Sequence, residues 1–382
     1  MTTTIRLRGP ADIITVLPYH LGYRPADSLV VVCLRRNRIG VVGRIDLPPA
    51  DVDPDLVAVE LLPVVRRERP DAVVIVGFEG SAGQAEPASV AMRDAIRAAG
   101  IRVLDRLLVR DGRWWSLDCD GDCCPSEGEV VQADDEVPAV TDYIVRGRRP
   151  ARSRADLADR LENRPDAEQD TRCAAFIHDL RTAQRSRTTL HRRRRRMFHH
   201  WARILDMTSA GPDAVSTPPA SGDEAWAWAV VSLLDVPIRD LLIAWMCPGT
   251  LDLGVFPASL RRLAEAELPS RTALLGWAGT GPAAADMVAE AGRQMLEETV
   301  DEAGADVVEG GLVDRLAMVC RAAPPELSPG PLTVLAHVVW WLGDGALART
   351  ALDRALKVDP DYRLARLLER MVDVAARPRA SA

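Results

Sequence analysis

Over the first 133 residues, short apolar runs of strand length alternate with stretches of helical periodicity. The run "DSLVVVCLR" at 27–35 is rich in β-branched residues, and "RIGVVGRIDLP" at 38–48 follows after a short polar turn, so the two predict a hairpin. The continuous apolar run "DAVVIVGF" at 71–78 predicts a central strand that is buried on both faces. Strands that alternate with helices predict an α/β sandwich over residues 1–133.

Two helices and a second hairpin complete this first part. Residues 53–70 predict a helix, and Pro63 is expected to strain that helix or to end it early. Residues 86–100 predict a second helix that closes at a glycine. Residues 101–117 predict a hairpin whose turn is Asp111-Gly112.

From about residue 134 the strand pattern is absent and helical periodicity takes over. Ser153 and Asp156 form a capping pair, after which a long helix is expected through residue 207. Residues 208–223 are small, polar and rich in proline, which is the composition of a linker. We therefore expect three parts, namely an α/β domain at 1–133, an arginine-rich helical connector and linker at 134–222, and an α-helical bundle at 223–382.

The last part of the bundle has the pattern of one tetratricopeptide-type helical hairpin. Gly343 falls in the expected turn, and Ala348, Leu352 and Ala355 line the second helix, where small side chains let paired helices approach closely. About three such units are needed to bury a continuous core, so the alternative is an ordinary helix pair of the bundle.

Several segments together resemble an actinobacterial domain family of unknown function. They are "LRGPADIITVLPYHLGYRPADSLVVVCLR", "GRIDLP", "WWSLDC", "CCPSEG" and "ALARTALDRALKVDPDYRLARLL". The resemblance runs from near residue 5 to near residue 370 and implies no activity, substrate or catalytic residue.

Composition and charge restrict the class of protein. Hydrophobic residues make up 47% of 382 residues and the net charge is −7, which is typical of a soluble globular protein of two or three domains. We expect a cytoplasmic protein without membrane contact, because the start has no signal-peptide pattern and no apolar run approaches the ~20 residues of a membrane span. Seven cysteines scattered along such a chain favour reduced thiols.

A basic stretch interrupts this acidic chain. Residues 144–204 contain 17 arginines and seven acidic residues, although arginine is the default cation of a chain with a single lysine. Five consecutive arginines circle the expected helix completely, since each residue advances it by ~100°. They are Arg192, Arg193, Arg194, Arg195 and Arg196.

These arginines need partners, and two kinds are available. The apolar face of the helix carries Leu190, Met197, Trp201 and Ile204, so the arginines beside it cannot all reach bulk water. Acidic helices of the bundle, among which "LEETVDEAGADVVEG" is the richest in carboxylates, would be the internal partner, and nucleic-acid phosphate the external one. Tethering favours the internal partner, so we expect nucleic acid to bind only weakly and to be released by moderate salt.

The stretch "WWSLDCDGDCCPSEG" is the nearest approach to a chemical motif. Cys119, Cys123 and Cys124 would supply three of the four ligands that zinc requires, so a zinc site needs a further ligand from elsewhere in the chain. The alternating aspartates imitate a calcium loop but lack its central glycine. We favour a compact turn with buried thiols and expect no cofactor, with zinc as the alternative.

Two further places offer polar groups for a small ligand. His20, Asp27 and Ser28 lie in "PYHLGYRPADS", which we interpret as a polar loop before a strand, and the last two also suit a side-chain-capped turn. Gly77 and Gly80 lie in "VGFEGSAGQAEP", where the chain leaves the best central strand. In α/β sheets this edge binds ligands, and backbone N–H groups there can cradle a phosphate.

The leading functional hypothesis is a non-enzymatic interaction or regulatory module with a protein partner. The first alternative is nucleic-acid or anion binding through the arginine helix. The second is an enzyme with a small-molecule site at the carboxyl edge of the sheet, although nucleophile-elbow and phosphate-loop motifs are absent from the sequence.

Overall fold

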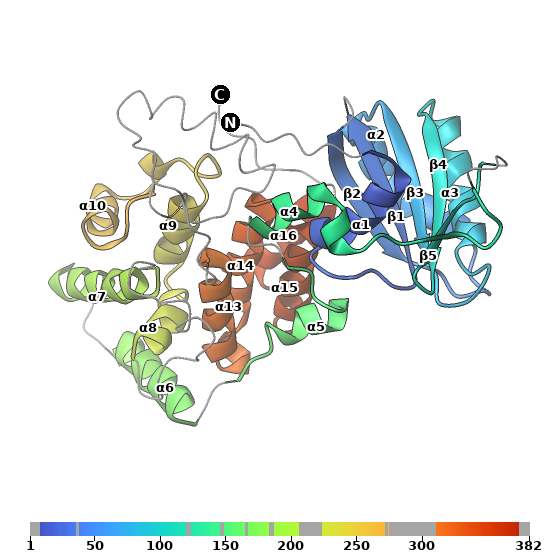
Figure 1. Ribbon diagram of the computed structural model, residues 1–382. Coiled ribbons are helices and arrows are strands. Elements are labelled where there is room, and N and C mark those ends of the chain that lie inside the picture. The colour runs from blue at the N-terminus through green and yellow to red at the C-terminus, as the bar shows by residue number, and fades with distance from the viewer. Residues whose placement is uncertain are drawn as a thin grey trace. The chain divides into compact units, whose positions relative to one another are not determined.

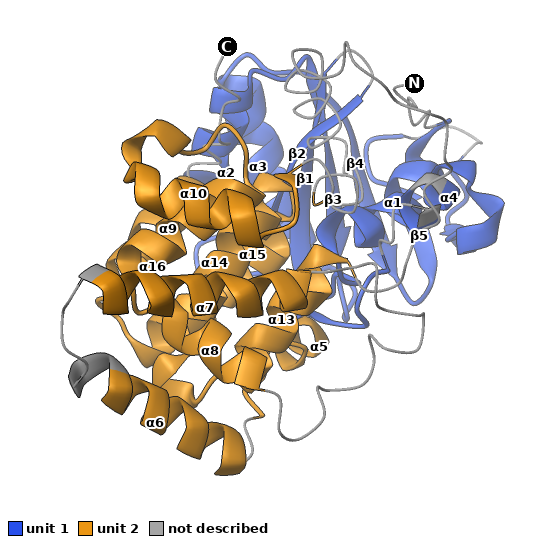
Figure 2. Cartoon of the chain, turned by 90° about the vertical axis from the view of Figure 1, so that its left-hand side faces the viewer, with its two compact units in different colours: residues 1–154, 373–375 blue, residues 155–372, 376–382 orange. Residues whose placement is uncertain are grey.

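The computed structural model describes residues 8–35, 38–119, 124–145, 149–164, 167–182, 187–205, 224–271, 274 and 311–373. The chain forms two compact units (Figure 2). Unit 1 comprises residues 1–154 and 373–375, and unit 2 comprises residues 155–372 and 376–382. The division into three parts at residues 133 and 222 stays a prediction.

Unit 1 is an α/β domain, as its hydrophobic pattern predicts. Its described residues form one six-stranded mixed sheet in the order β2-β1-β3-β4-β5-β6 (Figure 1). The elements are α1 (Pro10–Leu21), β1 (Ser28–Arg35), β2 (Arg38–Asp46), α2 (Asp55–Glu68), β3 (Ala72–Phe78), α3 (Glu86–Ala98), β4 (Val103–Arg110), β5 (Arg113–Ser116), β6 (Glu129–Val130), η1 (Asp134–Glu136) and α4 (Pro138–Val145).

Both predicted hairpins are present. β1 pairs antiparallel with β2 and with β3, whereas β3 and β4 are parallel and are connected through α3. β4 turns into β5 at Asp111 and Gly112, whose φ angles of 50° and 72° both lie in the left-handed region. That geometry is the tight turn that the Asp-Gly pair predicts.

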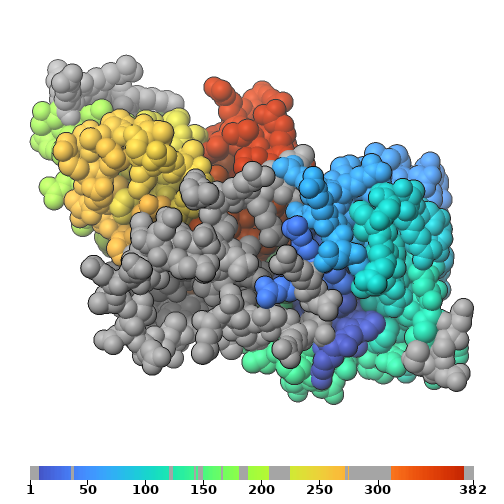
Figure 3. Space-filling model, turned by 90° about the horizontal axis from the view of Figure 1, so that it is seen from above, coloured from blue at the N-terminus to red at the C-terminus, as the bar shows by residue number. Residues whose placement is uncertain are grey.

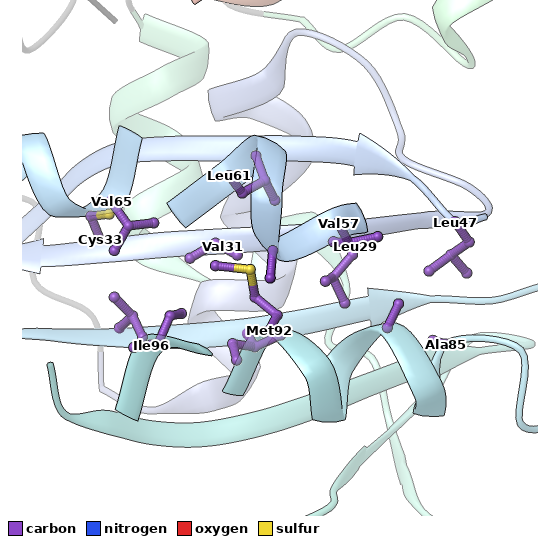
Figure 4. Packing of buried hydrophobic residues seen from close by; sticks show 14 residues of the cluster. Leu29, Val31, Cys33, Leu47, Val57, Leu61, Val65, Ala85, Met92 and Ile96 are labelled. Atoms are coloured by element: carbon purple, nitrogen blue, oxygen red, sulfur yellow. The ribbon is translucent and has the colours of Figure 1, made fainter. Parts of the chain in front are cut away.

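Helices α2 and α3 cover one face of the sheet. Val57, Leu61 and Val65 of α2 and Met92 and Ile96 of α3 are buried against alternate residues of β1 and β3 (Figure 4). The expectation that Pro63 would end its helix early is wrong, because α2 continues to Glu68. Pro63 lies on the exposed side, and burial of the opposite face stabilises the helix despite one missing backbone hydrogen bond.

Helices α1 and α4 lie on the other side of the sheet (Figure 2). There Val16 and Tyr19 of α1 pack on Val140 and Tyr143 of α4. This second layer completes an α/β sandwich around strands β1 and β3, which are the most deeply buried.

Unit 2 is helical throughout its described residues. The elements are α5 (Arg154–Asp159), α6 (Ala167–Thr182), α7 (Arg187–Leu205), α8 (Glu224–Ser232), α9 (Val236–Met246), η2 (Leu253–Val255), α10 (Ala258–Glu267), α13 (Leu312–Ala322), η3 (Pro325–Leu327), α14 (Pro329–Trp341), α15 (Gly345–Val358) and α16 (Arg363–Asp373). In the stretch from residue 153 to residue 207, where one long helix was predicted, the structure describes three helices, α5, α6 and α7.

Helix α14 is the centre of this bundle. Nearly all of its residues are buried, and it packs against α9, α13 and α15. The turn between α14 and α15 contains Gly343 with φ of 87°, and Ala348, Leu352 and Ala355 are buried as predicted. The likeness of this hairpin to a tetratricopeptide unit stays a prediction.

Some of the sequence-based predictions concern residues that the structure does not describe. The linker at 208–223, the acidic segment at 296–310 and the turn residues Arg36, Asn37 and Cys123 lie outside the described residues. Among the helices that are described, none combines the length and the apolar character that crossing a membrane requires.

Candidate functional site

The carboxyl edge of the central sheet brings together the polar residues of two loops. Ser28 at the start of β1 pairs with Phe78 at the end of β3, so Asp27 and Glu79 extend from neighbouring strand ends. The parallel strand β4 ends beside them at Arg110. The structure therefore joins two of the sequence-predicted places, the Asp27-Ser28 turn and the glycine loop after β3.

The carboxylate of Glu79 occupies the place in this loop where an anion would bind. Its two oxygens accept hydrogen bonds from the backbone N–H groups of Gly83 at 3.2 Å and Ala85 at 2.9 Å. The Arg110 guanidinium donates to the same carboxylate at 2.6 Å. Because the Glu79 side chain is fully buried, it neutralises the amide dipoles and the guanidinium from within.

Gly80 is bound by side chains of the protein in the same way. Its N–H group donates to Asp27 Oδ1 at 3.1 Å and to Gln84 Oε1 at 3.2 Å. A phosphate placed here would meet the carboxylates of Asp27 and Glu79 instead of free donors.

Gly77 has a packing role. A Cβ at this position would lie 2.6 Å from the Cβ of Ala85, which is closer than side-chain atoms approach, so glycine lets the start of α3 approach β3. This close approach sets the path of the loop that encloses Glu79.

Asp27 and Ser28 form the turn that leads into β1. Asp27 has a left-handed φ of 43°, and the Ser28 hydroxyl donates to the carbonyl of Ala26. Arg44 on β2 donates to the Ser28 oxygen at 2.6 Å and 2.9 Å. The interpretation as a side-chain-supported turn thus agrees with the geometry.

His20 belongs to the α1–α4 layer. The expectation that it lies in a polar loop is wrong, because it sits in the last turn of α1. Its Nδ1 is 3.3 Å from the hydroxyl of Tyr143 on α4. Nearby, Tyr19 donates to Asp134 at 2.7 Å, and burial together with that carboxylate raises the pKa of Tyr19 to about 12.

The arginine helix α7 is matched by carboxylates of neighbouring helices in unit 2. Arg194 forms a two-bond ion pair with Asp235, with both N–O distances at 3.0 Å. Arg195 binds Glu267 at 2.6 Å, and Arg196 binds Glu224 at 2.8 Å. The prediction of internal charge pairing is confirmed for these three arginines, although their partners differ from the acidic segment at 296–310.

The other two arginines of the run differ in exposure. Arg192 is exposed and Arg193 is half-buried. The face between them and the bundle core is apolar, as predicted, with Met197, Trp201 and Ile204 buried.

An aromatic stack lies beside this helix and was not predicted. The ring of Trp228 on α8 stacks on Phe176 of α6 at 4.4 Å and lies parallel to His200 at 6.0 Å. The Arg196 guanidinium sits over the same indole at 4.8 Å. Burial, and secondarily the charge of Arg196, lower the pKa of His200 to about 4, so this histidine is uncharged near neutral pH.

The cysteine stretch is described in part. Cys119 and Cys124 are half-buried, whereas buried thiols were expected. Nearby, the Trp115 indole donates to the carbonyl of Ser126 at 3.1 Å, and its ring packs on Gly128, where a Cβ would be 2.4 Å away. Within the described residues, no three metal-ligating side chains form a group that could hold an ion. With Cys123 outside the described residues, both the expectation of no cofactor and the zinc alternative stay untested.

Comparisons with known proteins extend over nearly the whole chain. A family model with the description "Domain of unknown function (DUF4192)" matches residues 10–291 and 256–379. No curated protein and no solved structure matches the chain.

Proposed function

Because the chain belongs to the family described as Domain of unknown function (DUF4192), which assigns no activity, we propose a function from the chain's own geometry. The protein acts in the cytoplasm as a non-enzymatic interaction or regulatory module that binds a protein partner.

The observation that carries this proposal is the self-occupied loop after β3. Glu79 and Asp27 use the amide donors that a phosphate or carboxylate substrate would need. A preformed small-molecule site keeps its polar groups directed toward an empty space, whereas these groups are directed toward each other. This arrangement weighs against the enzyme alternative.

The arginine helix α7 also favours a protein partner over nucleic acid. Three of its five consecutive arginines bind carboxylates of unit 2, so nucleic acid would have to displace these ion pairs. Breaking each of these ion pairs lowers the affinity of the chain for nucleic acid. We rank nucleic-acid binding second, because Arg192 is exposed on α7.

Affinity capture of the full chain from its native cells tests the proposal. The tagged chain is recovered at physiological salt with and without nuclease treatment, and co-purifying proteins are quantified against an untagged control. We expect one protein in near-stoichiometric amount. Recovery of nothing above the control, or of material that disappears with nuclease, contradicts the proposal.

The enzyme alternative is tested on the same preparation. Thermal unfolding is followed in the presence of nucleotides, phosphorylated sugars and carboxylic acids. We expect no shift in melting temperature, because the loop donors are occupied. A reproducible rise with one compound class would favour the enzyme instead.

A further inference from the structure

Helix α2 carries an apolar stripe on its outer side that its role in the core does not require. The inner face, with Val57, Leu61 and Val65, is buried under the sheet. On the outer face Leu56 is 52% exposed and Val59 is 67% exposed. Both faces of one helix are thus apolar over its first two turns, whereas a helix that covers a sheet needs only one apolar face.

A groove follows this outer side. It has a volume of about 590 Å³, and its described lining comes entirely from α2 and its C-cap. In the space-filling view, the described residues from 8 to 119 of unit 1, which include α2, form the blue to cyan surface (Figure 3). The lining residues are Ala58, Val59, Leu62, Pro63, Arg66, Arg67 and Arg69.

The charge of the groove has one sign. The residues that the structure describes along it include three arginines at the C-terminal end of the helix and no acidic residue. Arginines in a last turn suit the helix dipole, which explains their sign. The dipole does not explain why apolar residues, namely Val59, Leu62 and Pro63, lie next to these arginines and form the floor of the groove.

Pro63 also changes the backbone of this floor. Proline has no N–H group, so the carbonyl of Val59 cannot accept the helical hydrogen bond that residue 63 would otherwise donate.

We propose that this groove of α2 binds an acidic amphipathic helix of the partner protein, an inference that rests on the proposed interaction function. The apolar side chains of that helix cover Val59, Leu62 and Pro63, and its carboxylates pair with Arg66 and Arg69. Nucleic acid matches the arginines but leaves the apolar floor exposed, so an acidic peptide fits the whole groove better.

A pair of synthetic peptides tests the chemistry directly. One helical peptide of about 16 residues carries leucine on one face and glutamate elsewhere, and its twin carries lysine in place of glutamate. We expect the full chain to bind the glutamate peptide in fluorescence anisotropy and to bind the lysine peptide at least about tenfold more weakly.

Matched variants locate the binding. Arg66→Glu with Arg69→Glu reverses the charge of the groove, and Arg97→Glu reverses an exposed arginine in the last turn of α3. We expect the double variant to lose about tenfold or more in affinity for the glutamate peptide and the control to change little. Equal binding of the two peptides, or equal loss in both variants, overturns the proposal.

A photo-crosslinking amino acid at position 59 then identifies the occupant in cells. Position 130 on β6, where Val130 is 65% exposed, serves as the control. We expect crosslinks from position 59 to an acidic, leucine-containing peptide of another protein. Crosslinks only to this chain or to a basic peptide refute the groove assignment. If affinity capture still yields a stoichiometric partner, the interaction function stands and only the groove is wrong.

Discussion

At the scale of single residues, Glu79 shows how a side chain changes the chemistry of a glycine loop. The amides of Gly83 and Ala85 and the guanidinium of Arg110 form an anion-binding arrangement, and the chain fills it with its own carboxylate. The result is a connection between β3 and α3 that is held by its own side chains. A loop with the composition of a ligand site thus serves to fix the fold.

Removing this carboxylate is expected to destabilise unit 1. Glu79→Ala leaves the guanidinium and two amides without their acceptor, and breaking a buried ion pair of this kind typically costs about 3–5 kcal/mol. Since Arg110 is a quarter exposed, we expect the lower part of that range. Urea unfolding monitored by tryptophan fluorescence measures the change.

Glu60→Gln on the exposed side of α2 is the control for this substitution. It is expected to stay within about 0.5 kcal/mol of the parent chain. A loss of similar size in both variants would show that the network around Glu79 contributes no stability of its own.

At the scale of elements, helix α7 is held by ion pairs of unequal burial. The Arg194–Asp235 pair is about four-fifths buried on both sides, whereas Arg195 and Arg196 are more than half exposed. Asp235 and Glu224 also lie at the N-terminal ends of α9 and α8, where negative charge is favourable. The buried pair is therefore expected to fix how α7 packs on the bundle.

A double-mutant cycle of Arg194→Ala and Asp235→Ala measures that contribution. We expect a coupling energy of about 1–3 kcal/mol in chemical unfolding, because the two hydrogen bonds are charge-assisted and shielded from water. Arg192→Ala, at an exposed position of the same helix, is expected to change stability by less than about 0.5 kcal/mol. A coupling energy near zero would mean that the apolar face alone holds the helix.

Helix α14 carries a buried histidine that makes the stability of unit 2 depend on pH. Both ring nitrogens of His337 are buried, with no hydrogen-bond partner among the described residues. Burial lowers the pKa of His337 to about 4, partly opposed by the charge of Asp240. The folded state therefore holds a neutral imidazole near neutral pH.

The stability of unit 2 is expected to fall as the pH decreases from about 6.5 to about 4. In this range the unfolded chain binds a proton at residue 337 and the folded chain does not, so protons favour unfolding. His337→Phe should make this dependence less steep when urea midpoints are compared at several pH values, and the buried His200 accounts for part of the remainder. His191→Phe, at an exposed position of α7, should leave the dependence unchanged. An identical slope in the parent chain and His337→Phe would show that other groups cause it.

Most elements of unit 1 follow from local patterns, and the exceptions have a common cause. The apolar runs predict β1 and β3, and Asp111-Gly112 predicts its turn. Pro63 does not end α2, and Asp27 binds the amide of Gly80, which is 53 residues away. Both outcomes depend on tertiary contacts, which the periodicity of a single sequence does not contain.

The candidate sites, too, depend partly on local sequence patterns and partly on tertiary contacts. The need of the α7 arginines for acidic partners follows from their place beside an apolar face, but the choice of Asp235, Glu224 and Glu267 depends on how the helices pack. The groove on α2 has a local signal, because Leu56 and Val59 are apolar on the side opposite Leu61. Only the structure tells which of these two sides is exposed.

At the scale of the whole molecule, the distribution of charge determines how strongly the chain binds nucleic acid. The chain carries a net charge of −7, so nucleic acid is repelled overall and attracted only locally, at basic surfaces such as α7. There Arg195 and Arg196 are exposed but bind carboxylates, while Arg192 offers an exposed charge on the same helix. The local attraction is therefore smaller than the number of arginines suggests.

We expect weak binding of duplex DNA with a shallow salt dependence. If about two phosphates are contacted, affinity should fall about tenfold between 50 and 200 mM salt. Glu224→Gln with Glu267→Gln removes the partners of Arg196 and Arg195, so this variant should bind more tightly and show a steeper slope in fluorescence anisotropy. Tight binding by the parent chain at 200 mM salt, with a slope that the variant does not increase, would mean that the carboxylates do not compete with phosphate. Nucleic acid would then replace protein as the leading partner.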